Sequence, residues 1–231
     1  MTRRSVPSRH RDLVEELVAD LRPVRRLWSP GARWAAWVIA SGVAMAVVPA
    51  FLGMGMTPDV TRRLHDVSTM LGVALALGEA FLLAYLAFCA AVPGRELPRS
   101  GTLLLAAIAV VGIVFVVPQG PDPRLALYGF TMAGLPCLLM MLMIGMVPWL
   151  SLLVAVGRGA PSHPRLAGGL AASAAFLLPA AMLEAACPFV GRLHVLVWHV
   201  MPIVLLVAFS ALLLQIARPR VAHFAPRVRS A

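Results

Sequence analysis

The sequence predicts an all-α integral membrane protein: a six-transmembrane-helix bundle with a short cytoplasmic N-terminal amphipathic helix. Two features of the composition lead to this fold class. The 231 residues are 60% hydrophobic and have a mean hydropathy of +0.86, whereas a soluble domain is about half apolar. Only 13% of the residues are charged, and they separate apolar runs of about the 20 residues that a helix needs to cross a bilayer.

The first predicted element lies within a cytoplasmic segment, 1–33, and is an amphipathic helix in "RDLVEELVADLRPVRRLWSP", residues 11–30. Its apolar residues recur with the helical period and form one stripe, while acidic residues fill the other positions. Pro23 is expected to end the helix. The stripe consists of Leu13, Val14, Leu17, Val18 and Leu21.

A helix of about eleven residues is marginal alone in water, so its apolar face needs a covering. Lipid-surface helices favour basic residues on the polar face, whereas this helix carries four acids between residues 12 and 20. Docking on the protein's own loops or on the membrane stays open at this point. A partner protein that takes the helix in a groove is favoured. The predicted contact residues are Leu13, Val14, Leu17, Val18, Leu21, Val24, Arg25 and Arg26.

Six apolar runs follow, and each is a predicted span: about 34–54, 68–92, 102–118, 130–156, 166–187 and 193–217. Pro136 and Pro148 lie inside the fourth run, where proline is expected to kink a helix. Gly169 and Ser173 give the fifth run a small-xxx-small spacing, which permits close contact between helices.

The arginines predict the orientation of a membrane domain at 34–217. Sixteen of the twenty lie in the N-terminal segment, the 93–101 and 157–165 loops and the basic tail, 218–231. The positive-inside rule places these regions, and both termini, on the cytoplasmic side of a bacterial inner membrane. Topology therefore explains the net charge of +10, and no direct contact with nucleic acid is predicted.

Two of the three cysteines are predicted at the same depth in the membrane. Counting about 20 residues from the cytoplasmic ends of the fourth and fifth spans places Cys137 and Cys187 near the outer boundary. Cys89 falls at the inner end of the second span. Cys137 and Cys187 are therefore the candidate sensor residues, with small buried hydrophobes as the alternative interpretation.

Other ligand-type residues lie close to the second of these cysteines. Glu184 precedes Cys187 by three residues, and His194 follows it in the next span. With Cys137, these residues suit a soft or borderline metal ion such as zinc, copper or cadmium. His199 lies five residues after His194, a spacing that does not share one face of an α-helix.

No nucleotide-binding loop, nucleophile–base pair or HExxH motif occurs in the sequence, so the chain is not predicted to be an enzyme. A small six-helix transporter or efflux protein for a soft metal ion is an alternative function. The fourth span also carries five methionines, which act as flexible core residues or line a Cu(I) path: Met132, Met140, Met141, Met143 and Met146.

Several short motifs occur in order along the chain. They are "ADLRPVRRL" before the first span, "AVPGRELPR" after the second, "PCLLMMLMIG" in the fourth, "GRGAPSHPRLAGGLA" entering the fifth and "CPFVGRLHVLVWH" between the fifth and sixth. In this order they resemble the NrsF-type membrane anti-sigma factors, which are negative regulators of an extracytoplasmic-function sigma factor. The resemblance covers nearly the whole chain.

The resemblance implies a function for both ends of the predicted structure. The cytoplasmic segment, here 11–28, would sequester the sigma factor at the membrane. Two membrane-embedded cysteines, matched here by Cys137 and Cys187, would respond to heavy-metal or oxidative stress and release it. The expected partners are thus the sigma factor and membrane lipid. No resident cofactor is expected, with a soft metal ion as a transient signal.

Overall fold

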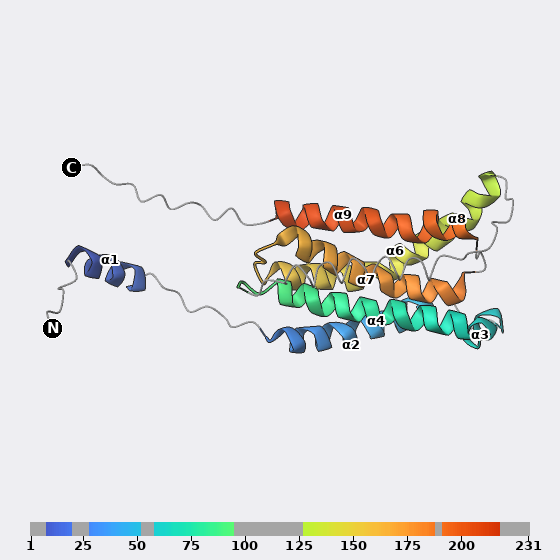
Figure 1. The fold of residues 1–231 in the computed structure, drawn as a ribbon, viewed down its shortest axis with the longest axis horizontal. Coiled ribbons are helices and arrows are strands. Elements are labelled where there is room, and N and C mark those ends of the chain that lie inside the picture. The colour runs from blue at the N-terminus through green and yellow to red at the C-terminus, as the bar shows by residue number, and fades with distance from the viewer. Residues whose placement is uncertain (1–7, 20–27, 52–57, 95–126, 188–190, 218–231) are drawn as a thin grey trace.

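Figure 1 shows a chain of helices, with no strand in the residues that the computed structural model describes: 8–19, 28–51, 58–94, 127–187 and 191–217. The helices are α1 (Ser8–Ala19), α2 (Pro30–Phe51), α3 (Pro58–Leu64), α4 (Val67–Ala90), α6 (Leu127–Gly157), α7 (Pro164–Ala186), α8 (Arg192–Val195), the π-helical segment η1 (Leu196–Val200) and α9 (Met201–Ile216).

Five helical segments among the described residues are long and apolar enough to cross a membrane: Pro30–Phe51, Val67–Ala90, Gly134–Gly157, Pro164–Ala186 and Arg192–Ile216. They coincide with the predicted first, second, fourth, fifth and sixth spans. The all-α class and these five apolar helices are thus confirmed. The predicted third span, 102–118, lies outside the described residues, as does the tail at 218–231.

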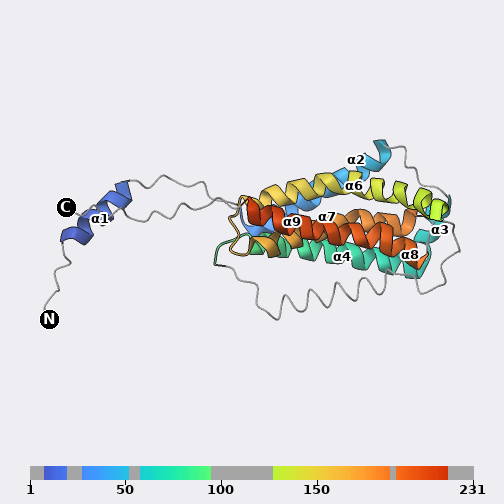
Figure 2. The same ribbon diagram turned by 90° about the horizontal axis from the view of Figure 1, so that it is seen from above.

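Helix α7 is the centre of the bundle, and α4, α6 and α9 pack around it (Figures 1 and 2). Two thirds of its span, 67%, is buried, against 22% for α2 and 17% for the last span. Its core positions are rich in alanine, and small side chains let neighbouring backbones approach closely. The outer helices present exposed apolar side chains such as Ile39 and Leu205, which is the surface that lipid accepts.

Helices α7 and α9 approach each other closely at Gly168. A Cβ atom there would lie 2.5 Å from the backbone oxygen of Ser210. At Gly169, which the small-xxx-small spacing pointed to, a Cβ atom would meet Val207 at an ordinary 3.6 Å. The crossing therefore depends on the absence of a side chain at residue 168.

Gly168→Ala is expected to destabilise the bundle, because a backbone atom cannot move aside as the end of a side chain can. Overpacking of this kind costs about 1–3 kcal/mol. Gly169→Ala is the matched control, since it gives the same gain in helix propensity without the clash. Thermal unfolding of the detergent-purified protein should show a lower midpoint for Gly168→Ala alone. Equal midpoints for the two variants would contradict the close crossing.

The two ends of the bundle carry different parts of the chain. At one end, the α6–α7 connection packs on the end of α4, so that a Cβ atom at Gly159 would lie 2.3 Å from the Ala91 oxygen. Helix α2 also begins at this end, where Arg33 donates a hydrogen bond to the Ala155 carbonyl near the end of α6. Helix α9 ends there as well (Figure 1). We call this the loop end. The opposite end, where α3 lies and α7 runs out at Cys187, is the cysteine end.

Helix α4 begins at the cysteine end with Asp66 as its N-cap. The Asp66 carboxylate accepts hydrogen bonds from the Ser68 hydroxyl and, at 3.0 Å, from the Thr69 backbone N–H. These bonds lower the pKa of the Asp66 carboxyl below its ordinary value. The ionised side chain satisfies backbone donors that a helix start leaves free, so the turn from α3 into α4 is locally defined.

Helix α1 lies apart from the bundle in both views (Figures 1 and 2). Its apolar residues Leu13, Val14 and Val18 are 52–58% exposed, so no described residue covers this part of the predicted stripe. The side chain of Leu17 is outside the described part of the chain. The same holds for the other predicted contact residues, Leu21, Val24, Arg25 and Arg26.

Candidate functional site

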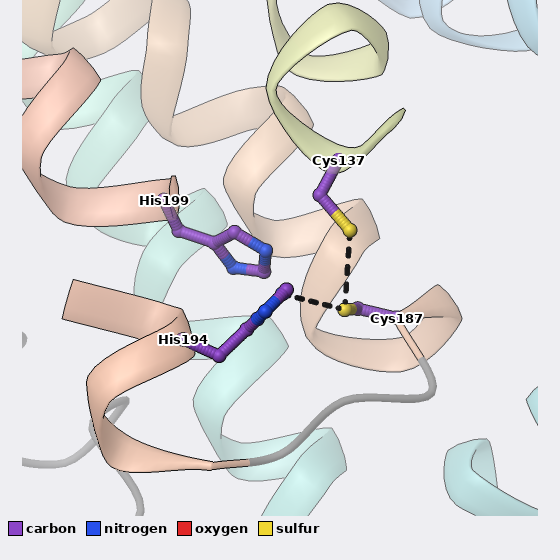
Figure 3. Close-up of side chains that lie close together, drawn as sticks. All are labelled: Cys137, Cys187, His194 and His199. Atoms are coloured by element: carbon purple, nitrogen blue, oxygen red, sulfur yellow. Dashed lines mark hydrogen bonds between the residues drawn. The ribbon is translucent and has the colours of Figure 1, made fainter. Parts of the chain in front are cut away.

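Cys137 and Cys187 lie side by side at the cysteine end. Cys137 belongs to α6 and Cys187 directly follows α7, and their Sγ atoms are 3.3 Å apart (Figure 3). A disulfide bond is about 2.05 Å long, so both residues are free thiols in this structure. Each is about 95% buried. The two cysteines were predicted to lie at the same depth in the membrane, and the packing of α6 against α7 brings their side chains into direct contact.

Two histidines from the last span complete the group. His194 in α8 places Nε2 3.4 Å from the Cys187 Sγ, and the rings of His194 and His199 meet edge to face with centroids 5.4 Å apart. Figure 3 shows the four side chains converging from three directions. One ligand atom from each residue lies within 4.8 Å of all the others, and all four residues are buried.

The π-helical segment η1 explains how two histidines five residues apart come together. In an α-helix they would point about 140° apart around the axis, at 100° per residue. In η1 the Met201 N–H bonds the Leu196 carbonyl five residues back, and this wider turn brings residues five apart nearly above one another. Pro202 follows one residue after η1 and lacks the N–H that would continue an α-helical ladder across this point.

A tight contact with α6 holds this segment in place. Trp198 of η1 packs directly on Gly134, where a Cβ atom would lie 2.0 Å from the indole ring. Gly134 is about one turn of α6 before Cys137, so the same stretch of α6 contacts η1 and carries one of the two thiols. Sequence inspection noted His199 but set it aside on α-helical geometry. The only local signal for the irregular turn was Pro202.

Glu184, a predicted metal ligand, does not join the four ligand atoms. Its carboxylate lies against Gly72 of α4, where a Cβ atom would meet Oε1 at 3.7 Å. It interacts electrostatically with His199 and with Arg63 of α3. Arg63 also donates a hydrogen bond of 2.6 Å to the Cys187 backbone oxygen. Glu184 and Arg63 therefore lie next to the group without belonging to it.

The remaining sulfur residues lie elsewhere. Cys89 is half-buried near the end of α4, at the loop end of the bundle. At 1.5 Å per residue, helices of this length separate the loop end from the cysteine end by about 30 Å. On α6, Met141 is fully buried, whereas Met132, Met143 and Met146 are exposed. These methionines therefore do not form a continuous line through the described part of the bundle.

The start of α2 is fastened to α6 and α4 at its aromatic residues. The Trp37 indole N–H donates to the Pro148 oxygen at 3.0 Å, and the Trp34 indole N–H donates to the Phe81 oxygen at 2.8 Å. The Arg33 guanidinium bonds the Ala155 oxygen and lies 4.8 Å from the centroid of the Phe88 ring. Helix α6 thus carries Cys137 in its first half and bonds the beginning of α2 through Pro148 and Ala155 in its second half.

Comparison with known proteins identifies the family. The family described as NrsF, negative regulator of sigma F, matches residues 17–217, which include every described helix of the bundle. The chain belongs to this family of sigma-factor regulators. No curated protein and no solved structure matches the chain.

Proposed function

We propose that this protein is a membrane anti-sigma factor that sequesters an extracytoplasmic-function sigma factor through its N-terminal segment. Membership of a family of negative sigma-factor regulators carries the proposal. The exposed apolar residues of α1, a helix separate from the bundle, support the position of the interface. A partner groove would cover Leu13, Val14 and Val18, together with Leu17, Leu21, Val24, Arg25 and Arg26 of the same segment.

The interface must face the cytoplasm for this function, and we propose six spans with both termini inside a bacterial inner membrane. The start of α2 and the end of α9 lie at the same end of the bundle. Helix α4 ends at the loop end and α6 begins at the cysteine end. A crossing of the membrane by the predicted span 102–118 would connect them. The arginine distribution supports the loop end as the cytoplasmic one.

Topology reporters should place both termini and the 93–101 and 157–165 loops in the cytoplasm. Fusions of a reporter active only in the periplasm should stay silent at these points and respond at residue 55, between the first two spans. The expectation rests on sixteen arginines on the loop-end side against four on the other. A periplasmic N-terminus would overturn the proposal, since no sigma factor could reach it.

We propose that the signal is chemistry at Cys137 and Cys187. Two buried thiols 3.3 Å apart can be oxidised to a disulfide, which gives two protons and two electrons to the oxidant, or can bind one soft metal ion together. Either event shortens or stiffens the contact between α6 and α7. Heavy-metal and oxidative stress are therefore the two signals that this site can read.

A route from this site to the sigma-binding segment runs along α6. A shift of α6 at Cys137 moves a helix whose Pro148 and Ala155 carbonyls bond the side chains of Trp37 and Arg33. These residues lie in the first turns of α2, directly after the N-terminal segment. The proposed output is therefore a change at the base of the segment that holds the sigma factor. The family assignment favours this function over a small transporter for soft metal ions.

Purification of the tagged full-length protein from native membranes tests the proposed function. Mass spectrometry of what co-purifies should identify a sigma factor in roughly stoichiometric amount, and treatment with cadmium or an oxidant should reduce it. A preparation from unstressed cells without any sigma factor would contradict sequestration.

A further inference from the structure

We infer that Cys137, Cys187, His194 and His199 form a four-ligand site for a divalent cation of the zinc class, Zn²⁺ or Cd²⁺, at the cysteine end of the bundle. The inference concerns metal binding itself, and only its regulatory meaning rests on the proposed function. Four groups that each offer one ligand atom lie within 4.8 Å of one another, although they come from three separate helices.

The separations fit tetrahedral coordination. Ligand atoms at the usual zinc–sulfur and zinc–nitrogen distances stand about 3.3–3.8 Å apart at tetrahedral angles. The Cys187 Sγ is 3.4 Å from the His194 Nε2, close to the sulfur–nitrogen value of about 3.5 Å. The two Sγ atoms, 3.3 Å apart, need to open by about 0.5 Å to reach the sulfur–sulfur value of about 3.8 Å. The longest separations, up to 4.8 Å, need to close by about 1 Å, and less for the larger cadmium ion.

The environment of His199 points to a ligand independently of these distances. His199 is 5% exposed, and its Nε2 atom is buried without a hydrogen-bond partner among the described residues. A buried polar nitrogen without a partner is costly. The protein nevertheless holds this ring against His194 through an irregular π turn, a feature that frequently marks functional sites.

Charge selects a divalent ion over Cu(I). As the metal binds, each thiol releases its proton to water, and the two thiolates carry a total charge of −2. With two neutral imidazoles and M²⁺ the site is neutral, which a low-dielectric location requires. With a monovalent ion, the ion and its four ligands would together carry one net negative charge. Four protein ligands also close the coordination sphere, as in structural rather than catalytic zinc sites.

The bound ion would join α6, α7 and the last span at one point. Cys137 belongs to α6, Cys187 follows α7, and the two histidines belong to the helix formed by α8, η1 and α9. Metal binding would therefore fix the relative positions of three helices whose opposite ends lie near the cytoplasmic segments, which is the regulatory consequence that depends on the proposed function.

Cobalt spectroscopy of the purified full-length protein tests the site. In detergent and without oxygen, one equivalent of Co²⁺ should produce the intense visible bands of tetrahedral cobalt and a thiolate-to-cobalt charge-transfer band, and Zn²⁺ or Cd²⁺ should abolish both. His199→Ala should weaken Co²⁺ binding about tenfold or more, since changing even a residue behind a ligand costs 10–100-fold. His65→Ala and Cys89→Ser, which alter residues outside the group, should bind as the unchanged protein does.

A variant that supplies a new ligand guards against simple misfolding. His199→Cys should keep Co²⁺ bound and strengthen the charge-transfer band, because three thiolates then contact the ion. A spectrum without thiolate bands, or unchanged affinity in His199→Ala, would overturn the inference. Retention of the sigma factor by the metal-free protein is measured separately. Its loss would count against the proposed function and leave the metal site unaffected.

Discussion

Replacement of Leu13 and Val18 by glutamate is expected to release the sigma factor and leave its target genes permanently expressed. Both side chains are more than half exposed on α1 and would be buried in a partner groove. A buried apolar anchor at such an interface is worth about 2 kcal/mol or more, so each charge should weaken binding about tenfold or more. Co-purification and a sigma-dependent reporter in unstressed cells measure the effect.

The variant also separates binding from folding. Glutamate has a higher helix propensity than valine, and α1 lies apart from the bundle, so α1 should stay helical and the membrane domain should stay intact. Asp12→Asn and Glu15→Gln, on exposed positions of the same helix, are the matched controls and should retain the sigma factor. Normal repression by the Leu13→Glu/Val18→Glu variant would show that this face is not the interface.

The second large effect is expected at the thiols. Cys137→Ser/Cys187→Ser should remove the response to cadmium and to oxidants, so that reporter activity with and without the inducer becomes equal. Serine neither forms a disulfide nor binds a soft metal well. The reporter activity of this variant without the inducer then distinguishes two cases. Permanent repression is expected if the thiols are needed for release, and permanent expression if serine imitates the signalled state.

Cys89→Ser is the control for this experiment. Cys89 lies at the loop end of α4, far from the four ligand residues, and its replacement should leave induction intact. The amount of each variant in the membrane needs to be equal for the comparison. Full induction of the double serine variant would refute the thiol sensor and direct attention to Glu184, Arg63 and the two histidines.

The sequence by itself determined the features that depend on local composition and periodicity. The apolar runs marked five described helices to within a few residues, because crossing a bilayer demands a long uncharged stretch whatever the neighbours are. The apolar stripe predicted α1 as a helix. The equal depth of Cys137 and Cys187 followed from the constant rise of a helix. The sequence alone could not show that the two thiols touch, because an equal depth does not determine how α6 and α7 are rotated or how they pack.

The choice of ligands was decided only by the tertiary structure. Residues three apart on a helix differ by about 60° around its axis, and at the cysteine end of the bundle this turns Glu184 towards α4 while Cys187 meets α6. His199 joins the group because α8, η1 and α9 do not keep the α-helical period. Trp198 packs on Gly134 of another helix, and this contact, formed between residues 64 positions apart, is compatible with a π turn that brings His194 and His199 together. Periodicity describes one helix in isolation, whereas the site depends on where three helices press against one another.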